Sequence, residues 1–278
     1  MIDEEYLEYP EEWEDRPRDT KIDEAKAELL DELFAKQPEE VFYARQVEVM
    51  YERRFFHWIT AKALRELHAE GRIRGQERSL SPVGVTSGVR MHLYWSPKNR
   101  YWKRQANEIE ALVRRFSDSR FTSAIGQHGE AMFDAALPTA GFLPSGRAVR
   151  EFGGRQWVAT RHDLDRVFGR GGRNYGVEIK NTLQYIVKEE LEIKLKMCAH
   201  LGLVPVFIVR MAPANYIEMV RVAGGFTLVF EHQLYPYGYG EFAKEVRERL
   251  GMKVDCPRAI AAGTIERVSK WAKKGEKP

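Results

Sequence analysis

The amino-acid sequence predicts an α/β protein, in which a mixed central sheet flanked by helices follows a small α+β unit. One observation is an almost wholly apolar run, "VPVFIV" at residues 204–209, which is typical of a strand covered on both faces. Another is the alternation of helical and strand-like stretches after residue 99. The third is a group of three helical stretches followed by two strand-like runs within residues 21–98.

Composition narrows the class of protein. A chain of 278 residues that is 44% hydrophobic and 31% charged fits one large or two modest globular domains. No run approaches the length of a membrane span and the N-terminus is acidic, so we expect no membrane partner and a cytoplasmic location. Cys198 and Cys256 lie far apart in the sequence, which indicates a reducing compartment and no structural zinc.

The charge is unevenly distributed. Residues 1–15 carry eight acids and no Lys or Arg, so the remaining chain has a net charge of +11 against +3 for the whole. We expect residues 1–20 to form an acidic tail on a basic body. A basic body fits a polyanion-binding protein, although ordinary solvated charges explain the same numbers.

Residues 21–98 are expected to form the first domain. Apolar residues recur at helical spacing in 22–36 and 55–73, a shorter helix fits 41–54, and strands fit 72–80 and 89–96. Three helices followed by a hairpin resemble a winged helix-turn-helix, whose third helix enters the major groove of DNA. The resemblance implies DNA contacts from five cations; an ordinary solvated face or a protein-binding domain remains the alternative. These cations are Lys62, Arg65, Arg72, Arg74 and Arg78.

Residues 99–278 are expected to form the second domain. After a linker, helices fit 102–116 and 123–137, and strands fit 156–168 and 175–181. A helix at 185–200, the apolar strand at 203–210, a further helix, a strand at 225–231 and two terminal helices complete the order. This succession predicts a mixed sheet with helices packed against it.

Two of these strands bring acids together. Gly171-Gly172 fits a two-residue hairpin turn, because both positions of such a turn favour positive φ. This turn places Asp165 opposite Glu178 and Asp163 opposite Lys180, and alternation puts all four side chains on one face. The opposite face would carry the residues that can be buried, which are Leu164, Phe168, Val177 and Ile179.

Facing carboxylates repel each other unless a cation neutralises them. Oxygen ligands suit Mg²⁺ or Mn²⁺, and such an ion can polarise a phosphoryl oxygen and lower the pKa of a bound water. A nearby lysine can orient that water or stabilise the developing charge. This set of residues therefore indicates phosphodiester hydrolysis, while a salt-bridged solvent-facing strand would show the same residue types.

Asp165 followed by Glu178-Ile179-Lys180 resembles the signature of the PD-(D/E)XK nuclease superfamily, the restriction-endonuclease-like proteins. The following helix and apolar strand match the order of that family's core, and "AIGQHGEAMFDAAL" offers Glu130 on the preceding helix, with Gly126 one turn earlier. The resemblance covers residues 120–212. No proline precedes Asp165, and Asp163 is a rival for the first ligand position.

The resemblance implies that Asp165, Glu178 and the backbone carbonyl of Ile179 hold Mg²⁺ or Mn²⁺. Lys180 would position the nucleophilic water, and Glu130 would be an accessory acid. Further DNA contacts are expected from Arg170, Arg173 and Gln184.

The function expected is a metal-dependent DNA endonuclease of restriction or repair type. It would act on double-stranded DNA, and as a homodimer if both strands are cut. The alternative is a non-catalytic winged-helix DNA-binding regulator.

Overall fold

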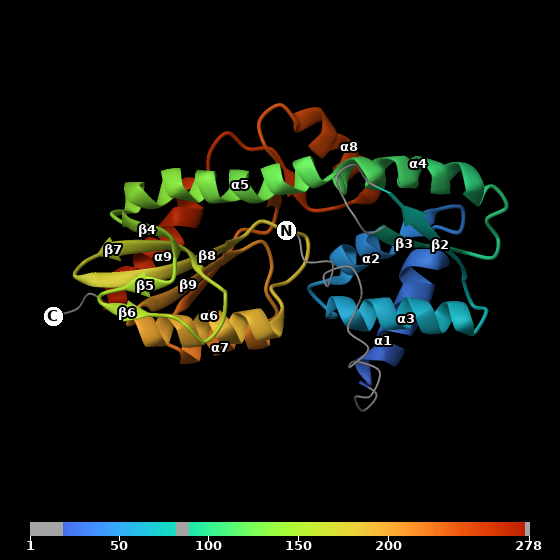
Figure 1. Ribbon diagram of the computed structural model, residues 1–278. Helices are drawn as coiled ribbons and strands as arrows, with labels where there is room; N and C mark the ends of the chain where they lie inside the picture. The colour runs from blue at the N-terminus through green and yellow to red at the C-terminus, as the bar shows by residue number, and fades with distance from the viewer. Residues whose placement is uncertain (1–18, 82–88, 276–278) are drawn as a thin grey trace. The chain divides into compact units, whose positions relative to one another are not determined.

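The computed structural model describes residues 19–81 and 89–275 (Figure 1). The described residues up to Ser123, with Lys244–Met252, form one compact unit, and Ala124–Ala243 with the described residues from Lys253 onward form the other. The sequence places the boundary at residues 98/99, whereas the units divide within α5 (Ser119–Ala136). The expected acidic tail at 1–20 lies outside the described residues apart from its last two.

The first unit combines helices with a three-stranded antiparallel sheet of order β1-β3-β2. The sequence did not predict β1, because its letters were assigned to the following helix. Val41, Phe42 and Tyr43 are all buried against β3, and the Gln46 side chain accepts the Tyr43 N–H, so the helix begins only at Ala44. The elements of the first unit are α1 (Lys21–Glu28), the π-helical turn η3 (Leu29–Phe34), β1 (Val41–Tyr43), α2 (Ala44–Tyr51), α3 (His57–Ala69), β2 (Arg74–Leu80), β3 (Val89–Trp95), α4 (Trp102–Phe116) and most of α8 (Gly240–Leu250).

The core of the first unit follows the predicted apolar periodicity. Side chains at helical spacing in α1, η3 and α3 meet in one cluster, which fixes the exposed face of α3. Large, fully buried members of this cluster include Ile22, Leu29, Leu33, Ile59, Leu64 and Leu67.

The second unit is built on a five-stranded sheet of order β10-β9-β8-β7-β4. The strands β4, β7 and β8 pair antiparallel, and β8, β9 and β10 pair parallel, so the α/β class with a mixed sheet is confirmed. The strands are β4 (Leu143–Val149), β7 (Leu164–Arg170), β8 (Arg173–Lys180), β9 (Val204–Val209) and β10 (Phe226–Val229), with short pairs β5 (Glu151–Phe152), β6 (Arg155–Gln156), β11 (Gln233–Leu234) and β12 (Val254–Asp255).

Helices cover both faces of this sheet (Figure 1). Side chains of α5 and α9 (Ala262–Gly275) share one apolar cluster with the sheet, and those of α6 (Lys188–Leu201) and α7 (Ala214–Val222) pack on the other face. Two-sided burial explains why β9 is apolar almost throughout. The remaining described helical segment is η4 (Leu137–Ala140).

Two strand predictions needed correction. The edge strand β4, "LPSGRAV", was not predicted, since its Pro, Gly and mostly exposed side chains hide any alternation. The strand expected at 156–168 begins only at Leu164. No described helix is both long and apolar enough to span a bilayer.

Candidate active site

The hairpin formed by β7 and β8 has the predicted register. The pairs run from Arg166 with Val177 to Arg170 with Arg173, and the turn residues Gly171 and Gly172 have φ values of +57° and +73°. Continued by one position, this register brings Asp165 level with Glu178. The Ile179 N–H donates to the Asp165 carboxylate at 2.7 Å, which fixes that carboxylate beside β8.

Glu178 is a buried carboxylate held between two lysines. Its residue exposure is 1%. Its Oε2 accepts a hydrogen bond from Lys194 Nζ at 2.8 Å, whereas its Oε1 lies 3.1 Å from Lys180 Nζ and has no hydrogen-bond partner. Oε1 makes no hydrogen bond and faces the partly exposed Lys180 ammonium, so of the two oxygens it is the better placed to bind a further cation.

The carboxyl group of Asp165 is affected by the negative charge of Glu178. Burial, followed by the charge of Glu178, raises the pKa of Asp165 from 3.8 to about 7. Near neutral pH its proton is therefore easily displaced, and a cation that binds both carboxylates would relieve their repulsion.

Lys180 keeps its positive charge. Burial by itself would lower the pKa of Lys180, but the carboxylates of Glu178 and Glu190 outweigh burial and raise it above its ordinary value. Lys180 Nζ lies 2.8 Å from Glu190, and its side chain is 28% exposed. The site therefore presents an ammonium group that can meet an anionic ligand.

Asp163, the rival first ligand, lies just before β7, and its main-chain carbonyl accepts a hydrogen bond from Lys194. Leu164 corrects the predicted face. Phe168, Val177 and Ile179 pack together as expected, but Leu164 belongs to the cluster of Val149 and the α6 side chains. Strict alternation therefore fails at the first residue of β7.

Glu130 belongs to an ion-pair network centred on the buried Arg166. Arg166 Nη2 donates to Glu130 at 2.7 Å, and its Nε donates to Asp134 at 2.8 Å. Its Nη1 donates to the main-chain carbonyl of Asp165 at 2.6 Å. The carboxylate expected to be an accessory acid is thus engaged by Arg166, and this guanidinium links it to the main chain of Asp165.

The oxygen atoms at this site suit a hard divalent cation. Asp165 and Glu178 supply carboxylates, and the Ile179 carbonyl points to the β7 side, because the N–H and C=O of one strand residue face the same neighbour. Among the described residues, no three Asp, Glu, His or Cys side chains are grouped as a metal site. The residues present therefore fit an ion held by two side chains, one carbonyl and other oxygen ligands such as water or phosphate.

Sequence reasoning missed the part that α6 plays. Glu190 and Lys194 lie four residues apart on this helix, a spacing that places both on one face. Glu190 pairs with Lys180, and Lys194 pairs with Glu178. The spacing was visible in the sequence, but the face turned toward the sheet was not.

Asn181, which follows Lys180, has a structural role. Its side-chain amide donates to the carbonyls of Ile125 and Leu234, and its Oδ1 accepts the Leu234 N–H. A Cβ on Gly129 would lie 2.6 Å from the Asn181 Cβ, whereas a Cβ on Gly126 would meet no atom within 4 Å. The close approach of α5 to Asn181 therefore occurs at Gly129 and not at Gly126.

The predicted DNA-contacting residues differ in their exposure and in the contacts that they make within the chain. Arg65, Arg72, Arg74 and Arg173 are exposed, and Lys62 and Gln184 are half-buried. Two arginines are engaged within the chain. Arg78 Nη1 donates to Asn107 at 2.9 Å and to Glu110 at 2.7 Å, and Arg170 Nη1 donates to Ser269 at 3.0 Å with its guanidinium over the Phe142 ring.

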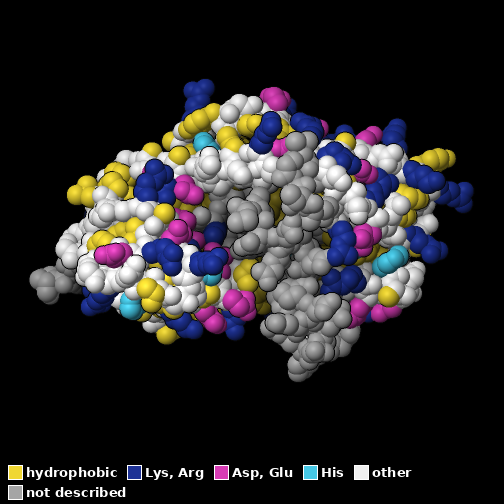
Figure 2. Space-filling model, in the orientation of Figure 1, with side chains coloured by type: hydrophobic (Ala, Val, Ile, Leu, Met, Phe, Trp, Pro, Cys, Tyr) yellow, Lys and Arg dark blue, Asp and Glu magenta, His cyan; other side chains and the backbone are white. Residues whose placement is uncertain are grey.

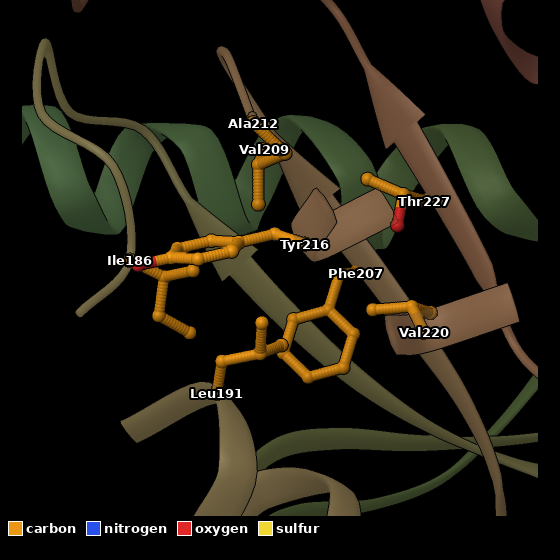
Figure 3. Close-up of a pocket in the computed structure, with 8 residues that line it drawn as sticks. All are labelled: Ile186, Leu191, Phe207, Val209, Ala212, Tyr216, Val220 and Thr227. Atoms are coloured by element: carbon orange, nitrogen blue, oxygen red, sulfur yellow. The ribbon is translucent and has the colours of Figure 1, made fainter. Parts of the chain in front are cut away.

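A small apolar cavity lies on the α6–α7 side of the sheet (Figure 3). It has about 10 Å³ of space for the centre of a water molecule, which is far too little for a nucleotide. It is lined by Ile186, Leu191, Phe207, Val209, Ala212, Tyr216, Val220 and Thr227. The cluster of Asp165, Glu178 and Lys180 is thus the candidate site, and this cavity is a packing defect.

Comparison of the chain with protein-family profiles, curated proteins and solved structures finds no match in any of the three.

Proposed function

We propose that this protein is a metal-dependent endodeoxyribonuclease of the PD-(D/E)XK type. The observation that carries the proposal is the juxtaposition of Asp165, Glu178 and Lys180 at the end of one β-hairpin. Burial and the neighbouring Glu178 carboxylate raise the pKa of Asp165, and this pair of carboxylates next to a charged lysine fits a site that holds a cation against a phosphodiester.

Each residue has a distinct role in the proposed reaction. Asp165, Glu178 and the Ile179 carbonyl would hold Mg²⁺ or Mn²⁺, which when bound supplies polarisation of a phosphoryl oxygen and a more acidic water. Lys180 orients the attacking water and stabilises negative charge on the phosphoryl oxygens. The water oxygen bonds to phosphorus, the bond to the 3′ oxygen breaks, and that oxygen takes a proton. The products are a 5′-phosphate and a 3′-hydroxyl.

We further propose that the first unit is a winged-helix domain that binds double-stranded DNA. Its order of helix, strand, two helices and two strands supports this, as does the exposed Arg65 on α3. Cations also lie close together where β2 begins. Arg74 is opposite Trp95 in the β2–β3 register, so the residues just after Trp95 lie near the start of β2. Arg72, Arg74, Lys98 and Arg100 are exposed and make no ion pair with the part of the chain that the structure describes. Lys and Arg side chains are seen on the visible surface of this unit in Figure 2.

A second candidate is a non-catalytic DNA-binding regulator. Lys180 and Lys194 both lie within ion-pair distance of Glu178, as they would in a purely structural buried network. In that case the first unit would carry the whole function, and Lys180 could be replaced without changing any activity on DNA.

Incubation with supercoiled plasmid separates the two candidates. The nuclease produces nicked or linear DNA with Mg²⁺ and none with a chelator, whereas the regulator shifts the plasmid in a gel without cutting it under either condition. Linear product formed without accumulation of nicked circles would indicate two cooperating copies, which sedimentation of the protein–DNA complex would test. A parallel incubation with RNA tests specificity for DNA.

A further inference from the structure

A buried lysine occupies one side of Glu178. Lys194 Nζ donates to Glu178 Oε2 at 2.8 Å and to the Asp163 carbonyl, and its side chain is 5% exposed. The other carboxylate oxygen, Oε1, makes no hydrogen bond. Lys180 Nζ lies 3.1 Å from Oε1, but its side chain is 28% exposed and can move aside for an ion, whereas the 5% exposed Lys194 could not do so without leaving a buried ammonium unpaired. Oε1 is therefore the oxygen of Glu178 that a metal ion can reach.

We infer that Lys194 is a built-in cation of this site, so that the site binds a single divalent ion. The inference rests on the proposed metal site. Paired metal ions lie about 3.5–4 Å apart and share oxygen ligands. A second ion on Oε2 would have to displace the Lys194 ammonium or lie against it, and repulsion between cations in a buried site opposes both.

Lys194 is a positioning residue in this account. It neutralises Glu178 from the α6 side and leaves Oε1 facing Lys180. A merely structural ion pair would attach α6 to the sheet and would change stability when removed, but it would leave ion number and ion affinity unchanged.

The test is a titration of the full-length chain with Mn²⁺, followed by the electron paramagnetic resonance signal of the free ion. The wild-type protein is expected to bind one Mn²⁺ per chain. Lys194→Met removes a positive charge next to the site, so we expect it to bind Mn²⁺ at least about tenfold more tightly. Two ions per wild-type chain, or an unchanged affinity in a folded Lys194→Met variant, would overturn the inference.

Two variants complete the experiment. Lys196→Met removes an exposed charge from the same helix and is expected to keep the wild-type affinity. Lys194→Arg retains the charge and is expected to keep one ion per chain. If Lys194→Met does not fold, the ion count of the wild type and of Lys194→Arg decides. Absence of Mn²⁺ binding by the folded wild type would refute the metal site itself, and with it the proposed function.

Discussion

The main-chain N–H of Ile179 donates to the carboxylate of Asp165 across the two strands of one hairpin, at 2.7 Å. This bond places the aspartate beside Glu178, although the regular pairing of the two strands extends only to Arg166, the residue that follows Asp165. It favours the ionised carboxylate, yet burial and Glu178 outweigh it and raise the pKa of Asp165 to about 7. Ionised Asp165 and Glu178 therefore repel each other in the folded protein, and a bound cation would reduce this repulsion.

This repulsion predicts how stability depends on pH. The unfolded chain loses the Asp165 proton near pH 4, whereas the folded protein keeps it to about pH 7. The folded state therefore binds more protons in this interval, and the Asp165 contribution to stability falls as the pH rises through it. Without metal, Asp165→Asn is expected to raise the free energy of unfolding at pH 8 by about 2–4 kcal/mol and to do little at pH 4. Urea denaturation at both values measures this.

Stabilisation of the folded protein by Mg²⁺ should depend on pH in the opposite direction and increase as the pH rises. The ion competes with the Asp165 proton, so it is expected to raise the melting temperature more at pH 8 than at pH 5.5. Asp165→Asn should abolish most of this effect, whereas Glu151→Gln, at an exposed position on β5, should retain it. An equal Mg²⁺ effect in all three proteins would contradict a site at Asp165.

Lys180 is the residue whose loss should separate catalysis from binding. Replacement by alanine removes the ammonium next to Glu178 and is expected to lower the cleavage rate by about 10²–10⁴-fold. DNA affinity, measured by fluorescence anisotropy without metal, should stay within a few-fold. Lys188→Ala is the control, because that lysine is exposed and its ion pair among the described residues is with Glu192 on the same helix. Normal cutting by Lys180→Ala would remove the lysine from the mechanism.

The parts that could be predicted from the sequence are those fixed by local geometry. Adjacent glycines determined the hairpin turn, and the period of two then determined the pairs from Arg166 onward. The orientation of α6 toward the sheet depends on packing between distant segments. The pairing of Lys194 with Glu178 therefore could not be read from the residues, nor could the place of Leu164 in the α6-side cluster.

Two glycines on α5 test the contact between this helix and the end of β8. A Cβ at position 129 would lie 2.6 Å from the Cβ of Asn181, whose amide group is fixed by three hydrogen bonds. Gly129→Ala is therefore expected to lower the free energy of unfolding by about 1–3 kcal/mol. Gly126→Ala meets open space in the same helix and should raise it by up to about 1 kcal/mol. Thermal melts of both variants give the comparison, and equal effects would show that the close approach is tolerated.

Arg74 and Arg78 lie on the same strand but should behave differently toward DNA. Arg74 is exposed, whereas the guanidinium of Arg78 is bound by Asn107 and Glu110. A phosphate contact releases counterions, so Arg74→Ala is expected to reduce the slope of log affinity against log salt concentration by about 1. Arg78→Ala should leave this slope unchanged and lower stability by up to about 1 kcal/mol. Anisotropy titrations on duplex DNA over a range of salt concentrations measure both slopes. A reduced slope for Arg78→Ala alone would mean that its intramolecular contacts open when DNA binds, and that the exposed arginine is not the one that meets a phosphate.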